Sequence, residues 1–223
     1  GEKKHLELAE YFINERGRDT GFYQKEAEKR DWTVWNSNPW DNDYRQSHIP
    51  VREQTAAVGH AVRAVYLYTG MAALAAETGD KELLAACDRL WSNITEKQMY
   101  ITGGIGSTVI GEAFSVDYDL PPDTAYAETC AAVGLIFFGR AMLKNKIDGK
   151  YGDICERAFY NGVLAGMALD GKSFFYVNPL EVIPGISGVS SNYRHDLPQR
   201  PKWYACACCP PNVARLVASF GKY

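Results

Sequence analysis

The sequence predicts a mainly α-helical domain in which helical hairpins follow one another along the chain. Apolar residues recur at helical spacing through most of the 223 residues, and Gly-Asp or Asp-Gly turns separate neighbouring helical segments. Only the segment near residues 173–183 alternates as a β-strand does, and it predicts a small β-hairpin. Hairpins in series with long loops between them are typical of helices that ring a central cavity, with a site built by the loops at one end.

The first half of the chain is predicted to hold one short helix and one helical hairpin. Residues 4–15 carry apolar side chains near helical spacing, and residues 18–50, which have no period, are predicted to form a long loop. A helical stripe covers residues 51–78 and ends at Gly79. Asp80 is the predicted N-cap of the next helix, whose apolar residues follow the i, i+3, i+4, i+7 pattern.

A second irregular stretch, residues 99–122, contains glycines at 103, 104 and 106. Such a cluster can form a phosphate-binding loop, but here no lysine follows the glycines and no β-strand precedes them. The sequence therefore predicts a tight glycine-rich turn.

Three further helices are predicted beyond this stretch. Asp123 or Thr124 is expected to cap a helix that reaches residue 143, and an Asp-Gly turn leads to a second helix over residues 151–167. The third, residues 213–220, follows a polar loop.

The composition excludes some classes of partner. The chain has 24 basic and 27 acidic residues, a net charge of −3, and no run of Lys or Arg that would bind a phosphate backbone. Its longest apolar run, residues 131–138, is far shorter than the roughly 20 residues that cross a bilayer. The sequence predicts a soluble protein that binds neither nucleic acid nor membrane.

The first residue, Gly1, is not a natural start, so the chain is expected to be a fragment. The missing beginning is where a signal peptide would lie. The compartment is therefore left open between the bacterial cytoplasm, the periplasm and the medium.

Near the C-terminal end, the stretch WYACACCPPN places Cys206, Cys208 and Cys209 within four positions, directly before two prolines. Adjacent cysteines point in different directions on a regular backbone, so at most one of Cys208 and Cys209 can face an ordinary core. The prolines predict a non-helical turn, with Asn212 as N-cap of the next helix. A thiol ahead of a helix N-terminus is favoured as thiolate. Cys87 and Cys155, by contrast, lie in apolar helical patterns and are predicted to be buried thiols.

Glu128 and Cys130 lie near the start of a predicted helix. Together with Cys208 and Cys209 they would provide one carboxylate and three thiolates, a set that tetrahedral zinc accepts. Two residues apart is about 200° around an ideal helix, so both could reach one ion only if the first turn were distorted or the glutamate reached around. The alternative is a surface glutamate beside a core cysteine.

Glu112 lies in an apolar loop between Gly111 and Ala113. Such surroundings are expected to raise the pKa of its carboxyl, as a general acid near neutral pH requires; the alternative is a solvated loop glutamate. His60, on a helical stripe, is either a polar group facing a cavity or a core histidine with its hydrogen bonds satisfied. His48 and His195 are predicted to be loop residues.

Four segments carry a resemblance to a known family: HIPVREQTAAVGHAVRAVYLYTGMA, MYITGGIGS, GEAFSVDYDLPPDTAYAETCAAVGL and CACCPPNVARL. From about His48 onward the chain resembles glycoside hydrolase family 127, whose best-known activity is β-L-arabinofuranosidase. The resemblance implies an (α/α)6 barrel that is followed, in the family, by β-sandwich domains. Residues 1–223 would be a single domain, the C-terminal half of that barrel, in a longer multidomain enzyme.

The resemblance also implies roles for individual residues. A zinc ion would be bound by Glu128, Cys130, Cys208 and Cys209. Cys208 would be the nucleophile and Glu112 the general acid/base of a retaining hydrolysis. Three residues match positions that contact the sugar: His60, Tyr176 and, more weakly, Glu156. Cys206 matches no role and is assigned to structure.

Two other classes of function stay open. A non-catalytic zinc or thiol module would have a closed four-ligand site with no cavity beside it, and another helical-barrel sugar enzyme, such as an epimerase or lyase, would use histidine or tyrosine. Half a barrel would also expose helix faces. For such a fragment three outcomes are therefore left open: a dimer through these faces, a zinc site that is empty, and a chain that is inactive by itself.

Overall fold

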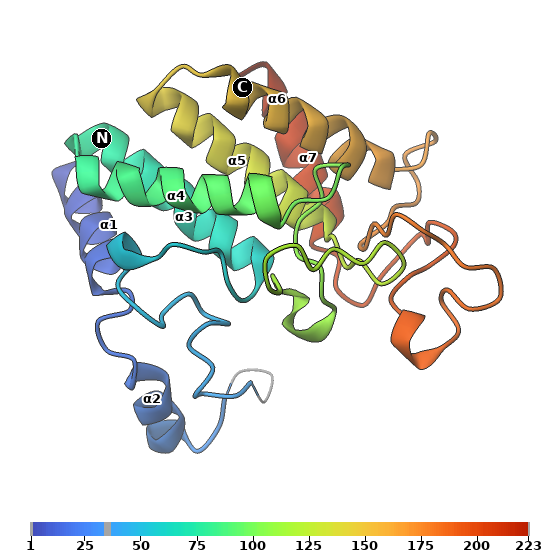
Figure 1. Cartoon of the computed structure of the whole chain (residues 1–223), viewed down its shortest axis with the longest axis horizontal. Helices are drawn as coiled ribbons and strands as arrows, with labels where there is room; N and C mark the ends of the chain where they lie inside the picture. The colour runs from blue at the N-terminus through green and yellow to red at the C-terminus, as the bar shows by residue number, and fades with distance from the viewer. Residues whose placement is uncertain (1, 34–36, 223) are drawn as a thin grey trace.

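The structure is a computed structural model that describes residues 2–33 and 37–222. It is mainly α-helical, as predicted (Figure 1). The helices are α1 (Lys3–Glu15), α2 (Phe22–Arg30), α3 (Ala61–Thr78), α4 (Lys81–Lys97), α5 (Thr129–Asn145), α6 (Gly149–Arg157) and α7 (Cys209–Ser219). In the described part of the chain, no helix is both long and apolar enough to span a bilayer.

The two helical hairpins predicted from the turn residues are confirmed. Between α3 and α4, Gly79 adopts φ +70°, and its N–H donates to the Ala75 carbonyl at 2.8 Å. Asp80 caps α4, since its Oδ1 accepts from the Leu83 N–H at 2.8 Å. Asp148 caps α6 through the Lys150 N–H at 3.2 Å. In each hairpin the second helix runs back alongside the first (Figure 1).

Helix α5 is the centre of the core, because it packs against α3, α6 and α7. Every residue from Thr129 to Ile136 is buried. The approach of α3 depends on Gly134, where an added Cβ would lie 2.4 Å from Val65 Cγ2. At the other face the ring of Trp91 lies edge-on to those of Phe138 and Tyr151, with centroids 5.3 and 5.0 Å away. Burying each such side chain stabilises the fold by about 1.5–3 kcal/mol.

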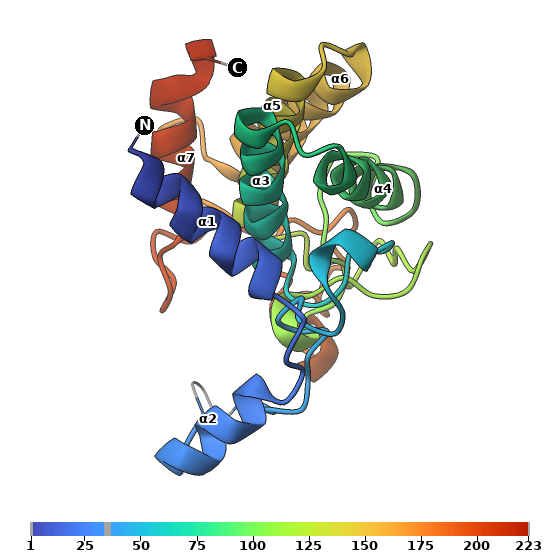
Figure 2. The ribbon, with the colours of Figure 1, turned by 90° about the vertical axis from the view of Figure 1, so that its left-hand side faces the viewer.

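Helices α3, α5 and α7 all begin at the end of the molecule where the long loops gather (Figure 1). In both views α2 lies apart from the other helices, beyond the loop that leads into α3 (Figure 2). The arrangement agrees with the predicted part of a helical barrel with its site at one end.

Three predicted boundaries are corrected. The loop predicted over residues 18–50 contains α2, and its residues 34–36 lie outside the described residues. The stripe over residues 51–78 divides into a single 3-10 turn, Val51–Glu53, and α3. The helix predicted over residues 151–167 leaves α-helical geometry after Arg157 and continues as the π-helical turn Ala158–Val163.

The β-hairpin predicted near residues 173–183 is wrong: these residues form isolated bridges and no strand. Their backbone groups bond to other segments instead of to each other. The Phe175 N–H donates to Gly166 at 2.8 Å, and the Tyr176 carbonyl accepts from the Thr129 N–H at 2.9 Å. The alternating pattern reflects an extended segment laid against the start of α5.

Candidate active site

The candidate site is built at the N-termini of α3, α5 and α7. The residue that directly precedes each helix, its N-cap, is a predicted site residue: His60 for α3, Glu128 for α5 and Cys208 for α7. Helix N-termini carry partial positive charge and unpaired N–H groups, so they favour anionic side chains.

The three thiols and the carboxylate predicted to bind metal lie together. The Cys130 sulfur is 3.3 Å from that of Cys208 and 3.5 Å from that of Cys209, and the latter two are 3.8 Å apart. Glu128 Oε1 lies 3.4 Å from the Cys208 sulfur. One ligand atom from each residue falls within 4.8 Å of all the others.

The spacing problem at Glu128 and Cys130 disappears because α5 begins later than predicted. Neither Asp123 nor Thr124 caps it; Glu128 does, with φ −59° and ψ 135°, so Glu128 lies outside the helix. The preceding residues are held by the glycine-rich turn, where the Ala127 N–H donates to the Gly106 carbonyl at 2.8 Å. An added Cβ on Gly106 would lie 2.9 Å from the Ala61 side chain, so this glycine serves close packing.

Helix α7 begins at Cys209, four residues earlier than predicted. Pro210 and Pro211 fit its first turn, because N–H groups there have no partner within the helix. Asn212 is therefore not the N-cap. Its Nδ2 donates to the Cys130 sulfur at 3.0 Å, and its Oδ1 accepts from Arg215 at 2.8 Å. Asn212 thus orients one of the candidate ligands.

The cluster fits a zinc ion on two counts. Zinc binds sulfur at about 2.3 Å in tetrahedral geometry, so ligand sulfurs lie about 3.8 Å apart, close to the separations seen here. In addition, Glu128 Oε2 is buried without a hydrogen-bond partner, which is costly for a carboxylate that no cation or donor satisfies.

The side chains around Cys208 favour its thiolate form. Hydrogen bonds from the thiols of Cys130 and Cys209, with a further contribution from Tyr176, hold the pKa of Cys208 far below the usual value. The pKa values of Cys130 and Cys209 are raised in turn. Burial, followed by the charge of Cys208, raises the pKa of Glu128 to about 8.

Glu112 lies beside this cluster, with its carboxylate within 4.8 Å of the Glu128 carboxylate. It accepts hydrogen bonds from His60 Nε2 at 3.1 Å and from the Tyr126 hydroxyl at 2.7 Å. His60 Nδ1 accepts from the Arg63 N–H, which leaves the ring proton on Nε2. The hydrogen bond from His60 is the largest influence and lowers the pKa of Glu112, whereas burial opposes it. The raised pKa predicted from the apolar loop is therefore wrong.

Aromatic side chains complete the site. Tyr176, buried as part of the extended segment, has its ring 6.1 Å from that of Tyr126 and 5.6 Å from that of Tyr204. His195, predicted to be an ordinary loop residue, lies with its ring 5.8 Å from Tyr126. Sequence reasoning missed Tyr126, because this segment was predicted to be helical; Ala127 instead adopts φ +40°, a conformation that no pattern in the sequence signals.

The positions of Glu156 and Cys206 do not agree with the roles predicted for them. Glu156 is an exposed residue of α6 and is not among the residues that gather around Cys208. Cys206 is exposed and does not fill the core; its thiol contacts that of Cys208. The structure gives Cys206 no packing role.

Comparisons with known proteins identify the family. The family model "Beta-L-arabinofuranosidase, GH127 catalytic domain" matches residues 1–222. A non-reducing end β-L-arabinofuranosidase of Bifidobacterium longum subsp. longum is 45% identical over 226 residues, which cover 100% of this chain and 34% of the relative. The crystal structure of Ara127N-Se, a GH127 β-L-arabinofuranosidase from Geobacillus stearothermophilus T6, superposes with a TM-score of 0.95 at 55% identity, covering 100% of this chain and 35% of that one.

A third protein, the GH127 β-arabinofuranosidase BT3674, superposes with a TM-score of 0.81 at 43% identity, and covers 100% of this chain and 30% of that one. The chain thus spans about a third of the length of the relatives it matches. Since the family model matches nearly every residue, the chain belongs to glycoside hydrolase family 127.

Proposed function

We propose that this chain carries the catalytic residues of a retaining β-L-arabinofuranosidase, with Cys208 as nucleophile and Glu112 as general acid/base. One observation carries the proposal: a thiol favoured as thiolate and a hydrogen-bonded carboxylate both lie against the same buried glutamate, Glu128. Retaining glycosidases need a nucleophile and an acid/base group a few ångströms apart, and here a thiolate stands in for the usual second carboxylate.

The ion that we assign to the cluster is zinc, bound by Glu128, Cys130, Cys208 and Cys209. Bound zinc would keep its thiolate ligands deprotonated at neutral pH and offset their negative charge. Three sulfurs and one oxygen favour zinc over the hard cations magnesium and calcium, which take oxygen ligands.

The protein residues carry the bond changes. The Cys208 sulfur attacks the anomeric carbon, forming a carbon–sulfur bond while the bond to the leaving oxygen breaks and Glu112 gives that oxygen its proton. In the second step the Glu112 carboxylate removes a proton from water, whose oxygen attacks the same carbon and releases the Cys208 sulfur. Two inversions give net retention.

The neighbours of Glu112 influence whether its carboxyl is ionised or protonated. His60 and Tyr126 donate to its carboxylate and favour the ionised form, which the second step uses. The first step draws on the protonated form. We assign His60 and Tyr176 to contacts with sugar hydroxyls as well, whereas the exposed position of Glu156 gives no support to such a contact.

We further propose that residues 1–223 form a single domain, the C-terminal half of an (α/α)6 barrel. Helices α3, α5 and α7 begin at the same end of the molecule, and α4 and α6 return alongside α3 and α5, which supports this (Figure 1). Association of two copies through exposed barrel faces stays a prediction, as does the compartment.

The test is release of arabinose from a synthetic β-L-arabinofuranoside by the zinc-loaded full-length enzyme that contains this chain. Glu112→Gln should keep its zinc and lose at least about 100-fold in turnover, since general acid/base groups contribute roughly 10²–10⁴-fold. Cys208→Ala should be inactive. A Cys208→Ala variant that retains activity would contradict the nucleophile assignment, and a zinc-loaded full-length wild-type enzyme that releases no arabinose would favour the non-catalytic zinc module.

A further inference from the structure

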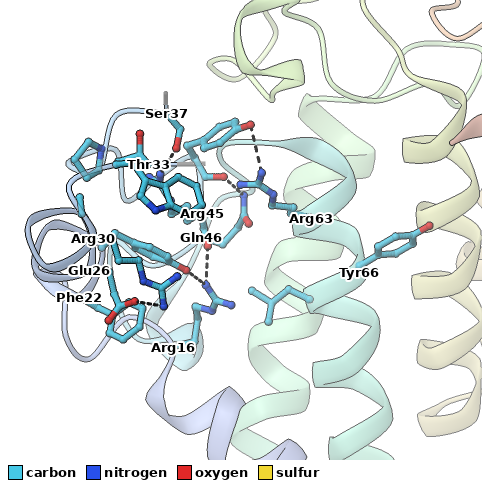
Figure 3. A pocket seen from close by; sticks show the side chains of 16 residues that line it. Arg16, Phe22, Glu26, Arg30, Thr33, Ser37, Arg45, Gln46, Arg63 and Tyr66 are labelled. Atoms are coloured by element: carbon cyan, nitrogen blue, oxygen red, sulfur yellow. Dashed lines mark hydrogen bonds and ion pairs between the residues drawn. The ribbon is translucent and has the colours of Figure 1, made fainter. Parts of the chain in front are cut away.

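A cavity that the proposed reaction does not use adjoins the site (Figure 3). It has a volume of about 630 Å³ and lies between the end of α1, helix α2, the loop that follows α2, and one face of α3. Sites for small molecules are typically about 300–1,000 Å³, so the cavity could hold one or two sugar rings.

The walls of this cavity carry guanidinium groups without carboxylate partners. Within the described residues, Arg16, Arg45 and Arg63 form no ion pair, unlike the neighbouring Arg30, which pairs with Glu26 at 2.7 Å.

The side chains of these arginines bond to neutral oxygens. Arg16 donates to the Tyr23 hydroxyl at 2.9 Å, Arg45 to Ser37 Oγ at 2.7 Å, and Arg63 contacts the Tyr44 hydroxyl at 3.5 Å (Figure 3). The cavity therefore has an uncompensated positive charge.

Aromatic rings line the same space. Phe22 and Trp32 are 51% and 56% exposed although they border the cavity. Arg45 lies over the ring of Tyr23 and Arg63 over that of Tyr44, with centroid distances of 4.6 and 4.5 Å. Stacking of this kind fixes a guanidinium plane. Arg45 also donates through Nη1 to the Asn38 and Asp41 carbonyls, at 2.8 and 2.9 Å, so most of its N–H groups are taken. Within the described residues, the guanidinium of Arg63 makes only the long contact through Nη2 to Tyr44, so its other N–H groups stay available for a carboxylate.

Two residues that line the cavity, Tyr44 and Arg63, contact His60 of the candidate active site. The Tyr44 ring centroid lies 5.9 Å from that of His60, and the Arg63 N–H donates to His60 Nδ1. The His60 N–H also donates to the Tyr44 carbonyl at 3.3 Å. A ligand that touches Tyr44 or Arg63 would therefore be separated from His60 by a single side chain.

We propose that this cavity binds an acidic sugar, a uronic acid residue, as the part of the substrate to which the arabinofuranose is attached. The inference rests on the proposed function and deepens it by naming the substrate class. Arg63 binds the carboxylate, because a guanidinium offers two parallel N–H groups that match its two oxygens, and Arg45 adds positive charge beside it. Phe22 and Trp32 pack against the sugar ring.

The test is calorimetric titration of the wild-type chain with D-galacturonic acid, D-galactose and inorganic phosphate. Galacturonic acid should bind at least about tenfold more tightly than galactose, since hydrogen bonds to a charged group are worth more than neutral ones. Arg63→Gln should remove most of this preference and Arg63→Lys should restore part of it. Arg157→Gln, an exposed arginine of α6, is the matched control and should bind as wild type does. Circular dichroism checks that each variant is folded.

Three results would overturn the inference: equal binding of galacturonic acid and galactose, phosphate binding as tight as that of galacturonic acid, or an unchanged preference in Arg63→Gln. The measurement needs no turnover, so its failure leaves arabinoside hydrolysis untouched. A chain that binds galacturonic acid as expected but cleaves no arabinofuranoside would fail only the proposed function.

Discussion

The N-termini of the five helices from α3 to α7 fall into two groups. Helices α4 and α6 begin at Asp80 and Asp148, whose carboxylates accept backbone N–H groups of the first turn. Helices α5 and α7 begin at Glu128 and Cys208, which make no such bond, and α3 begins at His60, whose ring nitrogen accepts the Arg63 N–H at a longer 3.3 Å.

The difference shows that the helices at the candidate site lack the stabilising hydrogen bond of a conventional N-cap. A good N-cap stabilises a helix by about 1 kcal/mol, which α5 and α7 forgo. In return their N-termini bring a carboxylate and thiolates together where positive helix ends favour negative charge. The burial of α5 against three other helices replaces the missing caps.

The largest effect expected from this comparison is on zinc binding. Cys130→Ser should weaken zinc affinity by more than about 100-fold, since loss of residues that merely support ligands already costs about 10–100-fold. Titration with a competing chelator measures this affinity.

Cys155→Ala is the matched control. Burial raises the pKa of the Cys155 thiol to about 12, so this cysteine is inert, and zinc affinity should stay unchanged in the variant. The free energy of unfolding should fall by about 1 kcal/mol from lost packing. Equal zinc loss in the two variants would contradict the division between site and core cysteines.

A smaller effect is expected at the conventional cap of α4. Asp80→Ala should lower the free energy of unfolding by about 1–2 kcal/mol and leave zinc affinity unchanged. The Leu83 N–H, followed by Arg52, lowers the pKa of Asp80. When the pKa of a carboxyl is lower in the folded than in the unfolded protein, its ionisation stabilises the fold. This stabilisation is fully present at pH values above the unfolded pKa and is lost as the pH falls through the folded pKa. The stability difference between wild type and variant should thus be constant above about pH 5 and shrink below about pH 4.

Urea unfolding of both proteins at several pH values measures this dependence. A difference that grows with acidity would contradict the capping role of Asp80. An effect of Asp80→Ala on zinc would instead mean that the two groups of helix N-termini are not independent.

The helix starts with conventional caps could be predicted from the sequence, whereas those at the candidate site could not. The cap at Asp80 and the turn before α6 follow from local rules and were predicted correctly. The starts of α5 and α7 were wrong, because Glu128 and Cys208 are poor caps kept at those positions for their chemistry. Local rules fail at functional sites for this reason.

The structure brings together the four predicted metal ligands and places Glu112 and His60 beside them, but it adds Tyr126 and leaves Glu156 outside. The thiol cluster follows from three cysteines near two prolines together with the family resemblance. The low pKa of Glu112 could not be predicted, since His60 lies 52 positions away and Tyr126 belongs to a segment expected to be helical. Long-range contacts of this kind become visible only when the helices are assembled.

X-ray absorption at the zinc K-edge of the purified wild-type chain tests the central claim most directly, namely that the N-termini of α5 and α7 form one thiolate-rich metal site. The account predicts one zinc per chain, with three sulfurs at about 2.3 Å and one oxygen at about 2.0–2.2 Å. Zinc bound only by nitrogen and oxygen, or a chain that binds no zinc when it is supplied, would contradict it.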